Sequence, residues 1–329
     1  MPSDAIDWKK IKALRSSFLH AQGDLADYWK DEALLTAYDQ TLAQRIGWKW
    51  RAVLDVMVER IPEALRSMPL WVDWGCGTGI ASRTLLAHGG LRCDELLTYD
   101  RSARAQRFAQ ARLRAEFPKQ KLAEPQHVSQ IDRPFVLLIS HVLSEMPPAA
   151  RAELVQLCNR ASLIVWVEAG RTLESRGLSE IREQLRARKT ILGPCLHQEP
   201  CGILAQDQNE NWCHFQAPIP QEVFRSAFWK TCSQELGFDL RRLPVSYLVA
   251  AQAELAPQAS DQEVPWRILG GSRAYKAFCR WTACTPQGIL EGEFLKRRSR
   301  AVFQGLIDSD LATQYTREEL EGSSSTPQD

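Results

Sequence analysis

The distribution of hydrophobic and polar residues divides the chain into a helical beginning, an alternating middle and a shorter last part. Residues 7–66 repeat apolar and aromatic side chains at helical spacing, without the alternation typical of strands. Strands are then expected near 70–74, 95–99, 126–129, 134–140 and 162–168, and helices at 79–88, 101–116, 148–160 and 174–189. This alternation predicts an α/β fold with a mostly parallel sheet covered on both faces.

After Glu183 the alternation breaks, and the composition changes several times. A helix is expected at 221–236 and a further strand at 244–251. The expected organisation is a helical region (1–67), an α/β domain (68–251) with a cysteine-rich insertion (193–216), a linker (252–264), a β-rich module (265–310) and a polar tail (311–329).

The overall composition is that of an ordinary globular protein. The chain has 329 residues, of which 44% are apolar and 25% charged, and its formal net charge is +1. Without a strong net charge, contact with RNA would need a local basic patch such as Lys296, Arg297, Arg298 and Arg300, although such runs are often only solvated. No apolar run has the roughly 18 residues of a membrane helix, and no signal or transit peptide is evident. We therefore expect a cytoplasmic, reducing location, no membrane partner and a monomer.

A glycine-rich loop follows the first expected strand. It places Gly75, Gly77 and Gly79 after Asp73, just before an expected helix. Glycines let a backbone turn sharply beside a ligand, and a helix start offers free N–H groups. Asp100, at the end of the second strand, can bond the two hydroxyls of a ribose, or can simply cap the next helix. The loop resembles the first motif of class I methyltransferases, which implies S-adenosylmethionine as the cofactor.

A cluster of cysteines and histidines is the second chemical feature. Cys195, His197 and Cys201 are followed closely by Cys213 and His214. In a reducing compartment such clustering favours metal ligation over disulfides. Zinc would take four nitrogen or sulfur ligands, whereas an iron–sulfur cluster would prefer four thiolates. The spacing does not choose between them.

A fourth thiolate could come from the β-rich module. Cys284 lies in a turn-like sequence that would present its side chain on a bend. Cys279 lies in an apolar stretch, where a packed thiol is the simpler interpretation.

The turn after the fourth strand is where many methyltransferases carry catalytic residues. Residues 140–147 contain neither an Asn-Pro-Pro-Tyr-like turn nor a nucleophilic cysteine. His141 and Glu145 could act as a base, but they could equally pack or cap a helix. The catalytic residues therefore remain unknown at this stage.

Together, these motifs resemble the methyltransferase-like proteins of mitochondrial small-ribosomal-subunit assembly, of the Rsm22 type, and their bacterial relatives. The resemblance runs from Tyr28 to Ile307, and the segments that carry it are 73–79, 140–147, 168–170, 193–201, 212–215, 246–248 and 284–288. It implies a class I methyltransferase-like fold, S-adenosylmethionine, binding to small-subunit rRNA, and a [4Fe–4S] cluster. By motif match, the cluster ligands would be Cys195, Cys201, Cys213 and Cys284.

Two positions depart from the family pattern. Ala169 replaces the proline of Glu-Pro-Gly, and Leu196 replaces the proline of Cys-Pro-His, but neither change removes a candidate ligand. The resemblance leaves two principal functions open: an assembly factor that binds the small subunit, or an active rRNA methyltransferase. A third possibility is a zinc-containing methyltransferase of small molecules.

Overall fold

The structure is a computed structural model that describes residues 6–20, 27–124, 128–205, 210–256 and 264–321. Its larger sheet has the order β3–β2–β1–β4–β5–β8–β6, with β7 paired to β8. The strands are β1 (Ser67–Trp74), β2 (Arg92–Tyr99), β3 (Lys121–Leu122), β4 (Val136–Ser140), β5 (Leu163–Ala169), β6 (Lys189–Gly193), β7 (Phe215–Gln216) and β8 (Pro244–Gln252). Strands β1 to β5 pair in parallel, whereas β8 runs antiparallel to β5, β6 and β7.

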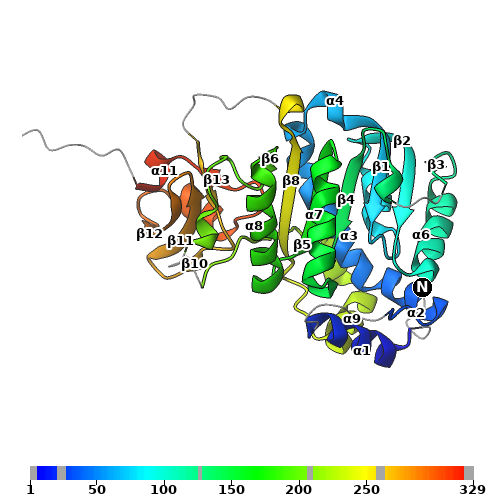
Figure 1. Cartoon of the computed structure of the whole chain (residues 1–329). Coiled ribbons are helices and arrows are strands. Elements are labelled where there is room, and N and C mark those ends of the chain that lie inside the picture. Colours follow the sequence, from blue (N-terminus) through cyan, green and yellow to red (C-terminus); the bar gives the residue numbers. More distant parts are fainter. Residues whose placement is uncertain (1–5, 21–26, 125–127, 206–209, 257–263, 322–329) are drawn as a thin grey trace, which may run out of the picture.

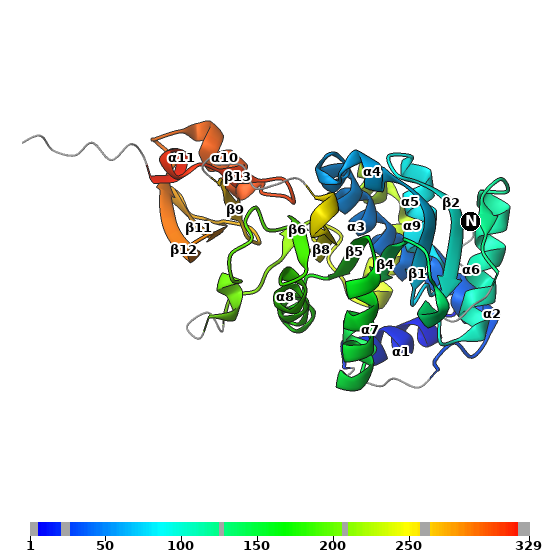
Figure 2. The same cartoon turned by 45° about the horizontal axis from the view of Figure 1, so that its top comes forward.

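Helices cover both faces of this sheet (Figures 1 and 2). They are α3 (Leu42–Met57) and α5 (Ile80–His88) on one face, and α7 (Pro148–Arg160) and α8 (Thr172–Arg186) on the other, with α6 (Ala103–Glu116) beside β2. The side chains of neighbouring β1 residues point to opposite faces of the sheet. Trp71 packs with α3 and α5, whereas Val72 packs with α7 and α8. The predicted class I methyltransferase-like α/β architecture is confirmed.

The N-terminal helices gather at the end of the sheet where the parallel strands finish (Figure 1). They are α1 (Trp8–Leu19) and α2 (Glu32–Gln40), and α9 (Ala227–Leu236) packs beside α1. The short helix α4 (Glu63–Arg66) lies at the opposite end of the sheet, where it leads into β1. Leu35 of α2 and Leu236 of α9 share a small core with Trp29. The helical N-terminal region is therefore held directly over the glycine-loop end of the sheet.

A separate antiparallel sheet forms the C-terminal module beside the β6 side of the larger sheet (Figure 1). It contains β9 (Trp266–Ile268), β10 (Arg273–Ala274), β11 (Phe278–Thr285), β12 (Gly288–Leu295) and β13 (Gln314–Tyr315), with α10 (Arg300–Ile307) and α11 (Arg317–Glu321). Its own core includes Trp281, Phe294 and Leu306.

Short 3-10 turns connect several of these elements. They are η2 (Val58–Arg60), η3 (Val128–Gln130), η4 (Leu143–Glu145), η5 (Gly202–Leu204), η6 (Gln221–Arg225) and η7 (Ala253–Leu255). Within the described ranges, no helix combines the length and apolar character needed to cross a membrane.

Four details of the predicted layout are wrong. The strand expected at 126–129 is not found in its described part, because 128–130 is a 3-10 turn and the edge strand is β3; residues 125–127 lie outside the described residues. The helix expected to reach residue 189 ends at Arg186, and β6 follows. The helix expected at 221–236 is interrupted before Ala227, because Ser226 caps a new helix by accepting the N–H of Trp229.

The fourth correction concerns the end of the chain. The expected tail contains β13 and α11 up to residue 321, and Leu320 is buried in the core of the C-terminal module. Residues 322–329 lie outside the described residues, as do 257–263 of the expected linker.

Candidate functional site of a glycine-loop pocket and a cysteine cluster

The glycine loop adopts a backbone that other residues rarely accept. Gly75 and Gly77 have φ angles of +69° and +52°. A Cβ at Gly75 would also lie 2.8 Å from Cγ1 of Val142, too close for any side chain. The N–H groups of Gly75 and Cys76 bond the carbonyl of Tyr99 at 2.8 and 3.0 Å, which fixes the loop against the end of β2.

Asp100 joins this loop to the start of α6. Its Oδ2 accepts the N–H of Gly77 at 2.8 Å, and its Oδ1 accepts the N–H of Ser102 at 2.8 Å. Burial raises the pKa of Asp100, while these two N–H groups act against the rise. The side chain is therefore in place both to organise the loop, as a cap would, and to accept further hydrogen bonds from a ligand, since each carboxylate oxygen has a second lone pair.

Asp73 lies beneath the loop. It is fully buried, and its Oδ2 accepts the hydroxyl of Ser82. Its Oδ1 has no hydrogen-bond partner among the described residues. Burial raises the pKa of Asp73 to about 6. Asp73 therefore supports the loop from behind, and its unpaired oxygen is a polar group for which the structure provides no protein partner.

The loop forms one wall of a cavity of about 320 Å³. Of the five residues predicted to bind the cofactor, Gly75, Gly77 and Asp100 line it, whereas Asp73 and Gly79 do not. The volume lies within the range of roughly 300–1,000 Å³ typical of small-ligand sites.

Aromatic residues of the N-terminal region form the opposite wall. Tyr28, Trp29 and Tyr38 line the cavity, and the Trp29 and Tyr38 rings lie 5.1 Å apart. The Tyr28 hydroxyl donates to Oε2 of Glu145 at 2.8 Å. The sequence alone does not assign these aromatics to the site, because their helical spacing is equally typical of core packing.

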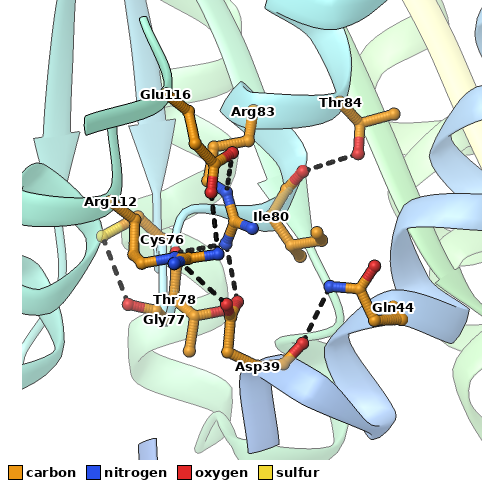
Figure 3. Close-up of polar contacts among 10 residues, drawn as sticks. All are labelled: Asp39, Gln44, Cys76, Gly77, Thr78, Ile80, Arg83, Thr84, Arg112 and Glu116. Carbon is orange, nitrogen blue, oxygen red and sulfur yellow. Dashed lines mark hydrogen bonds and ion pairs between the residues drawn. The ribbon is translucent and has the colours of Figure 1, made fainter. Parts of the chain in front are cut away.

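A charged network holds the N-terminal helices to the loop (Figure 3). Nη1 of Arg83 lies 2.6 Å from Oδ1 of Asp39, and its Nε lies 2.8 Å from Oε2 of Glu116. Arg112 contacts the same two carboxylates, at 3.3 Å from Asp39 and 2.8 Å from Glu116. Nη1 of Arg83 also lies 3.4 Å from the carbonyl of Thr78 in the loop. The network thus connects α2, α5 and α6 behind the cavity.

The two candidate bases, His141 and Glu145, line the same cavity. His141 has a φ of +54°, and its Nε2 lies 3.1 Å from Nζ of Lys49. Burial, assisted by the charge of Lys49, holds the pKa of His141 well below its usual value. Burial also raises the pKa of Glu145 to about 7 and lowers that of Lys49 to about 7. Glu145, which lines this cavity, and Lys49, which contacts His141, therefore both change protonation near neutral pH.

A second cavity of about 410 Å³ meets the first at these residues. His141, Glu145, Tyr38 and Ile46 line both cavities. Charged side chains of both signs line the second cavity: the basic Arg15, Arg45, Lys49, Arg171 and Arg242, and the acidic Glu145, Glu168, Glu174 and Asp239. The arrangement provides space for a second, polar molecule beside a ligand in the first cavity.

The four cysteines named by the resemblance come together on the β6 and β8 side of the sheet. Cys195, Cys201 and Cys213 line one small cavity. Burial, followed by the charges of Cys195, Cys284 and Cys201, holds the pKa of Cys213 well above its usual value. Burial, followed by Cys195 and Cys201, likewise raises the pKa of the Cys284 thiol. The four thiols are therefore close enough for their charges to influence one another.

Besides these four cysteines, the candidate ligands are Cys279, His214 and His197. Cys279 is buried in the core of the C-terminal module, and burial raises its pKa without any contribution from the other four cysteines. His214 stacks on Trp212, with ring centroids 4.6 Å apart. His197 is the histidine that adjoins the cysteines, with Nε2 at 3.5 Å from Sγ of Cys284.

The residues around the four cysteines limit the kind of inorganic group that could bind there. Cationic guanidinium groups lie nearby, because Arg182 and Arg267 each lower the pKa of Cys284. In the part of the chain that the structure describes, no three His, Cys, Asp or Glu side chains close around a point as one metal ion requires. In general, [4Fe–4S] clusters are held by four Cys thiolates.

Comparisons with known proteins agree with this layout. The family described as "Mitochondrial small ribosomal subunit Rsm22" matches residues 40–305, from the end of α2 into α10. No curated protein sequence matches the chain.

Among solved structures, similarity is found to methyltransferases at low identity. The magnesium protoporphyrin IX methyltransferase from Synechocystis, with bound SAM, is 14% identical, covers 75% of this chain and 98% of its own, and has a TM-score of 0.39. The precorrin-6y C5,15-methyltransferase from Geobacter metallireducens is 13% identical, covers 60% and 86%, and has a TM-score of 0.36. An rRNA methylase from Streptococcus thermophilus is 11% identical, covers 60% and 92%, and has a TM-score of 0.34.

Proposed function

This chain belongs to the Rsm22 family, and we propose from that premise that it is a methyltransferase-like assembly factor that binds the small ribosomal subunit through its rRNA. The family match over residues 40–305 carries the proposal, because it includes the glycine loop and all four clustered cysteines. We propose that the protein acts as a cytoplasmic monomer.

We propose that the cavity of about 320 Å³ holds S-adenosylmethionine. Asp100 would accept the ribose hydroxyls, and the N–H groups of the glycine loop would face the amino-acid part. The aromatic wall of Tyr28, Trp29 and Tyr38 would contact the adenine and exclude water. Bound S-adenosylmethionine supplies a methyl group on a sulfonium. The unpaired polar atoms Asp73 Oδ1 and Thr78 Oγ1 support a ligand in or near this loop.

We also propose that Cys195, Cys201, Cys213 and Cys284 hold a [4Fe–4S] cluster, with zinc as the alternative. The effects of neighbouring thiols on the pKa values of Cys213 and Cys284 support a shared inorganic group. Because Cys284 belongs to β11 and the other three to the insertion, the cluster would join the C-terminal module to the α/β domain. Part of the stability of this junction would then come from the cluster.

Association with small subunits tests the ribosomal role. The purified protein is mixed with a lysate and sedimented at moderate and at high salt. We expect co-sedimentation with small subunits, enriched on immature ones, that weakens as salt rises, because phosphate contacts release counterions. Recovery only in the soluble fraction at moderate salt would contradict the proposed function.

An active rRNA methyltransferase is the second candidate. The observation that favours it is the cavity of about 410 Å³, lined by charged side chains of both signs, that meets the proposed donor cavity at His141. In that case His141 or Glu145 would orient the acceptor or take its proton. Transfer of a labelled methyl group to precursor small subunits would support this candidate. Full donor binding without transfer would leave the assembly role alone.

A further inference from the structure

A third cavity, of about 490 Å³, lies between the α/β domain and the C-terminal module. Its wall is built from the end of α3 and η2, from β8 and from β9, and it includes Leu196 next to the cysteine cluster. Neither of the sites described above uses it. Its volume is that of a site for a small ligand.

Two arginines, Arg60 and Arg267, line this cavity. Arg267 is only 4% exposed, and its Nε and Nη1 donate to the carbonyls of Pro194 and Leu311 at 3.2 and 2.7 Å. Arg60 is half-buried, and no described residue forms a hydrogen bond or ion pair with its guanidinium. Burial, and then the charge of Arg267, lowers the pKa of Arg60. Like charges held together around a cavity are stabilised when an anion lies between them.

The wall also includes one acid and one unpaired hydroxyl. Asp55 is committed elsewhere, since its Oδ1 lies 3.1 Å from Nε2 of His88 and 3.3 Å from Nε of Arg51. Tyr247 is only 1% exposed, and its hydroxyl has no hydrogen-bond partner among the described residues. Its charged neighbours include Arg267 and Arg60, which oppose the effect of burial on its pKa. A buried hydroxyl rarely stays unpaired unless a ligand or water completes it.

We propose that this cavity binds a nucleoside phosphate, with Arg60, Arg267 and the Tyr247 hydroxyl around the phosphate oxygens. Guanidinium groups suit phosphate because their N–H groups match its oxygens in pairs. Apolar parts of the wall, including Val56 and Pro265, provide a surface for the base. The nucleotide can belong to rRNA, a source that rests on the proposed function, or can be free in solution, a source that does not.

Binding measurements on the full-length protein, purified anaerobically, test this site. The probes are adenosine and uridine monophosphates and a single-stranded RNA of mixed sequence, each titrated by calorimetry. The variants are Arg60→Ala and Tyr247→Phe, and Arg92→Ala, at an exposed position of β2, is the matched control. Tyr247→Phe keeps the buried ring, so it remains informative if Arg60→Ala alters folding.

We expect at least one probe to bind, and its affinity to fall about tenfold or more in Arg60→Ala and by a smaller factor in Tyr247→Phe, with Arg92→Ala unchanged. Weakening with the monophosphates identifies a free nucleotide, whereas weakening with RNA alone identifies an RNA nucleotide. Absence of binding by every probe, or wild-type affinity in both variants, overturns the site. Co-sedimentation with small subunits is measured separately, so the site can fail while the ribosomal role stands.

Discussion

Nε2 of His197 lies 3.5 Å from Sγ of Cys284, although 87 positions of sequence separate them. His197 belongs to the cysteine-rich insertion, and Cys284 belongs to β11 of the C-terminal module. The contact therefore marks where two distant segments meet around the thiol group. His197 is only 6% exposed, and its Nδ1 has no partner among the described residues.

The contact between His197 and Cys284 predicts that Cys284 is the fourth ligand of the proposed iron–sulfur cluster. Cys284→Ser should lose most of the bound iron, because it removes one of four thiolate ligands. Cys279→Ser is the control within the same strand, and it should keep the iron while losing some stability in the module core. Iron and acid-labile sulfide are measured on both proteins after anaerobic purification. The reverse pattern, with iron lost only from Cys279→Ser, would show that the fourth ligand is misassigned.

Replacement of Asp100 should abolish donor binding. Asp100→Ala removes the carboxylate that would accept the ribose hydroxyls and that also accepts the N–H of Gly77. We expect the affinity for S-adenosylmethionine in calorimetry to fall by a factor of about 100 or more, since two charge-assisted hydrogen bonds are lost. Asp94→Ala, at an exposed position of the same strand, should bind normally. Unchanged affinity in Asp100→Ala would refute the assigned donor site.

Glu145 predicts a specific pH dependence of stability. Its pKa is raised from 4.5 to about 7 by burial, so between these pH values the folded protein holds a proton that the unfolded chain releases. The contribution of Glu145 to the stability of the wild type should therefore fall as pH rises through this window. Glu145→Gln lacks this titration. The difference in the free energy of unfolding, variant minus wild type, should therefore increase by on the order of 1–3 kcal/mol from pH 5 to pH 8.

Urea unfolding at several pH values measures this difference. Glu63→Gln, at an exposed site, controls for the loss of a carboxylate in general. Curves for Glu145→Gln and wild type that stay parallel across the window would mean that Glu145 is not buried as described.

The charged network behind the glycine loop should contribute strongly to stability. Asp39→Ala leaves the buried Arg83 with Glu116 as its remaining carboxylate partner. We expect a loss of about 2 kcal/mol or more in the free energy of unfolding, because a buried charged group loses a hydrogen-bonded partner. Glu32→Ala, exposed on the same helix, should have a much smaller effect. Equal losses in the two variants would contradict the role given to the network.

The sequence predicts the features of this protein that local chemistry determines. The glycine loop could be recognised because Gly75 and Gly77 need left-handed backbone, which few other residues adopt. The buried strands β4 and β5 could be recognised as continuous apolar runs. By contrast, β6 was missed, because Lys189 and Thr190 extend the amphipathic pattern of α8 and only pairing with β8 makes the segment a strand.

The composition of the two sites depends on contacts that no local pattern contains. The aromatic wall of Tyr28 and Trp29 looks like core in sequence, and it becomes part of a cavity only because α2 packs over the end of the sheet. The participation of Arg60, Arg267 and Tyr247 in one cavity likewise requires the C-terminal module to lie against the α/β domain. The local sequence offered Cys284 as a candidate fourth thiolate, but only the resemblance assigned it to one centre with the insertion.

The central claim is that four thiols from two separate segments hold one iron–sulfur cluster. Anaerobic purification followed by iron, sulfide and zinc analysis tests it most directly, with Cys201→Ser as the ligand variant and Cys93→Ser, at a similarly half-buried cysteine, as the control. The account predicts about four iron and four sulfide per wild-type chain, the same in Cys93→Ser, and little of either in Cys201→Ser. Wild-type protein that carries zinc without sulfide, or keeps its iron in Cys201→Ser, would contradict it.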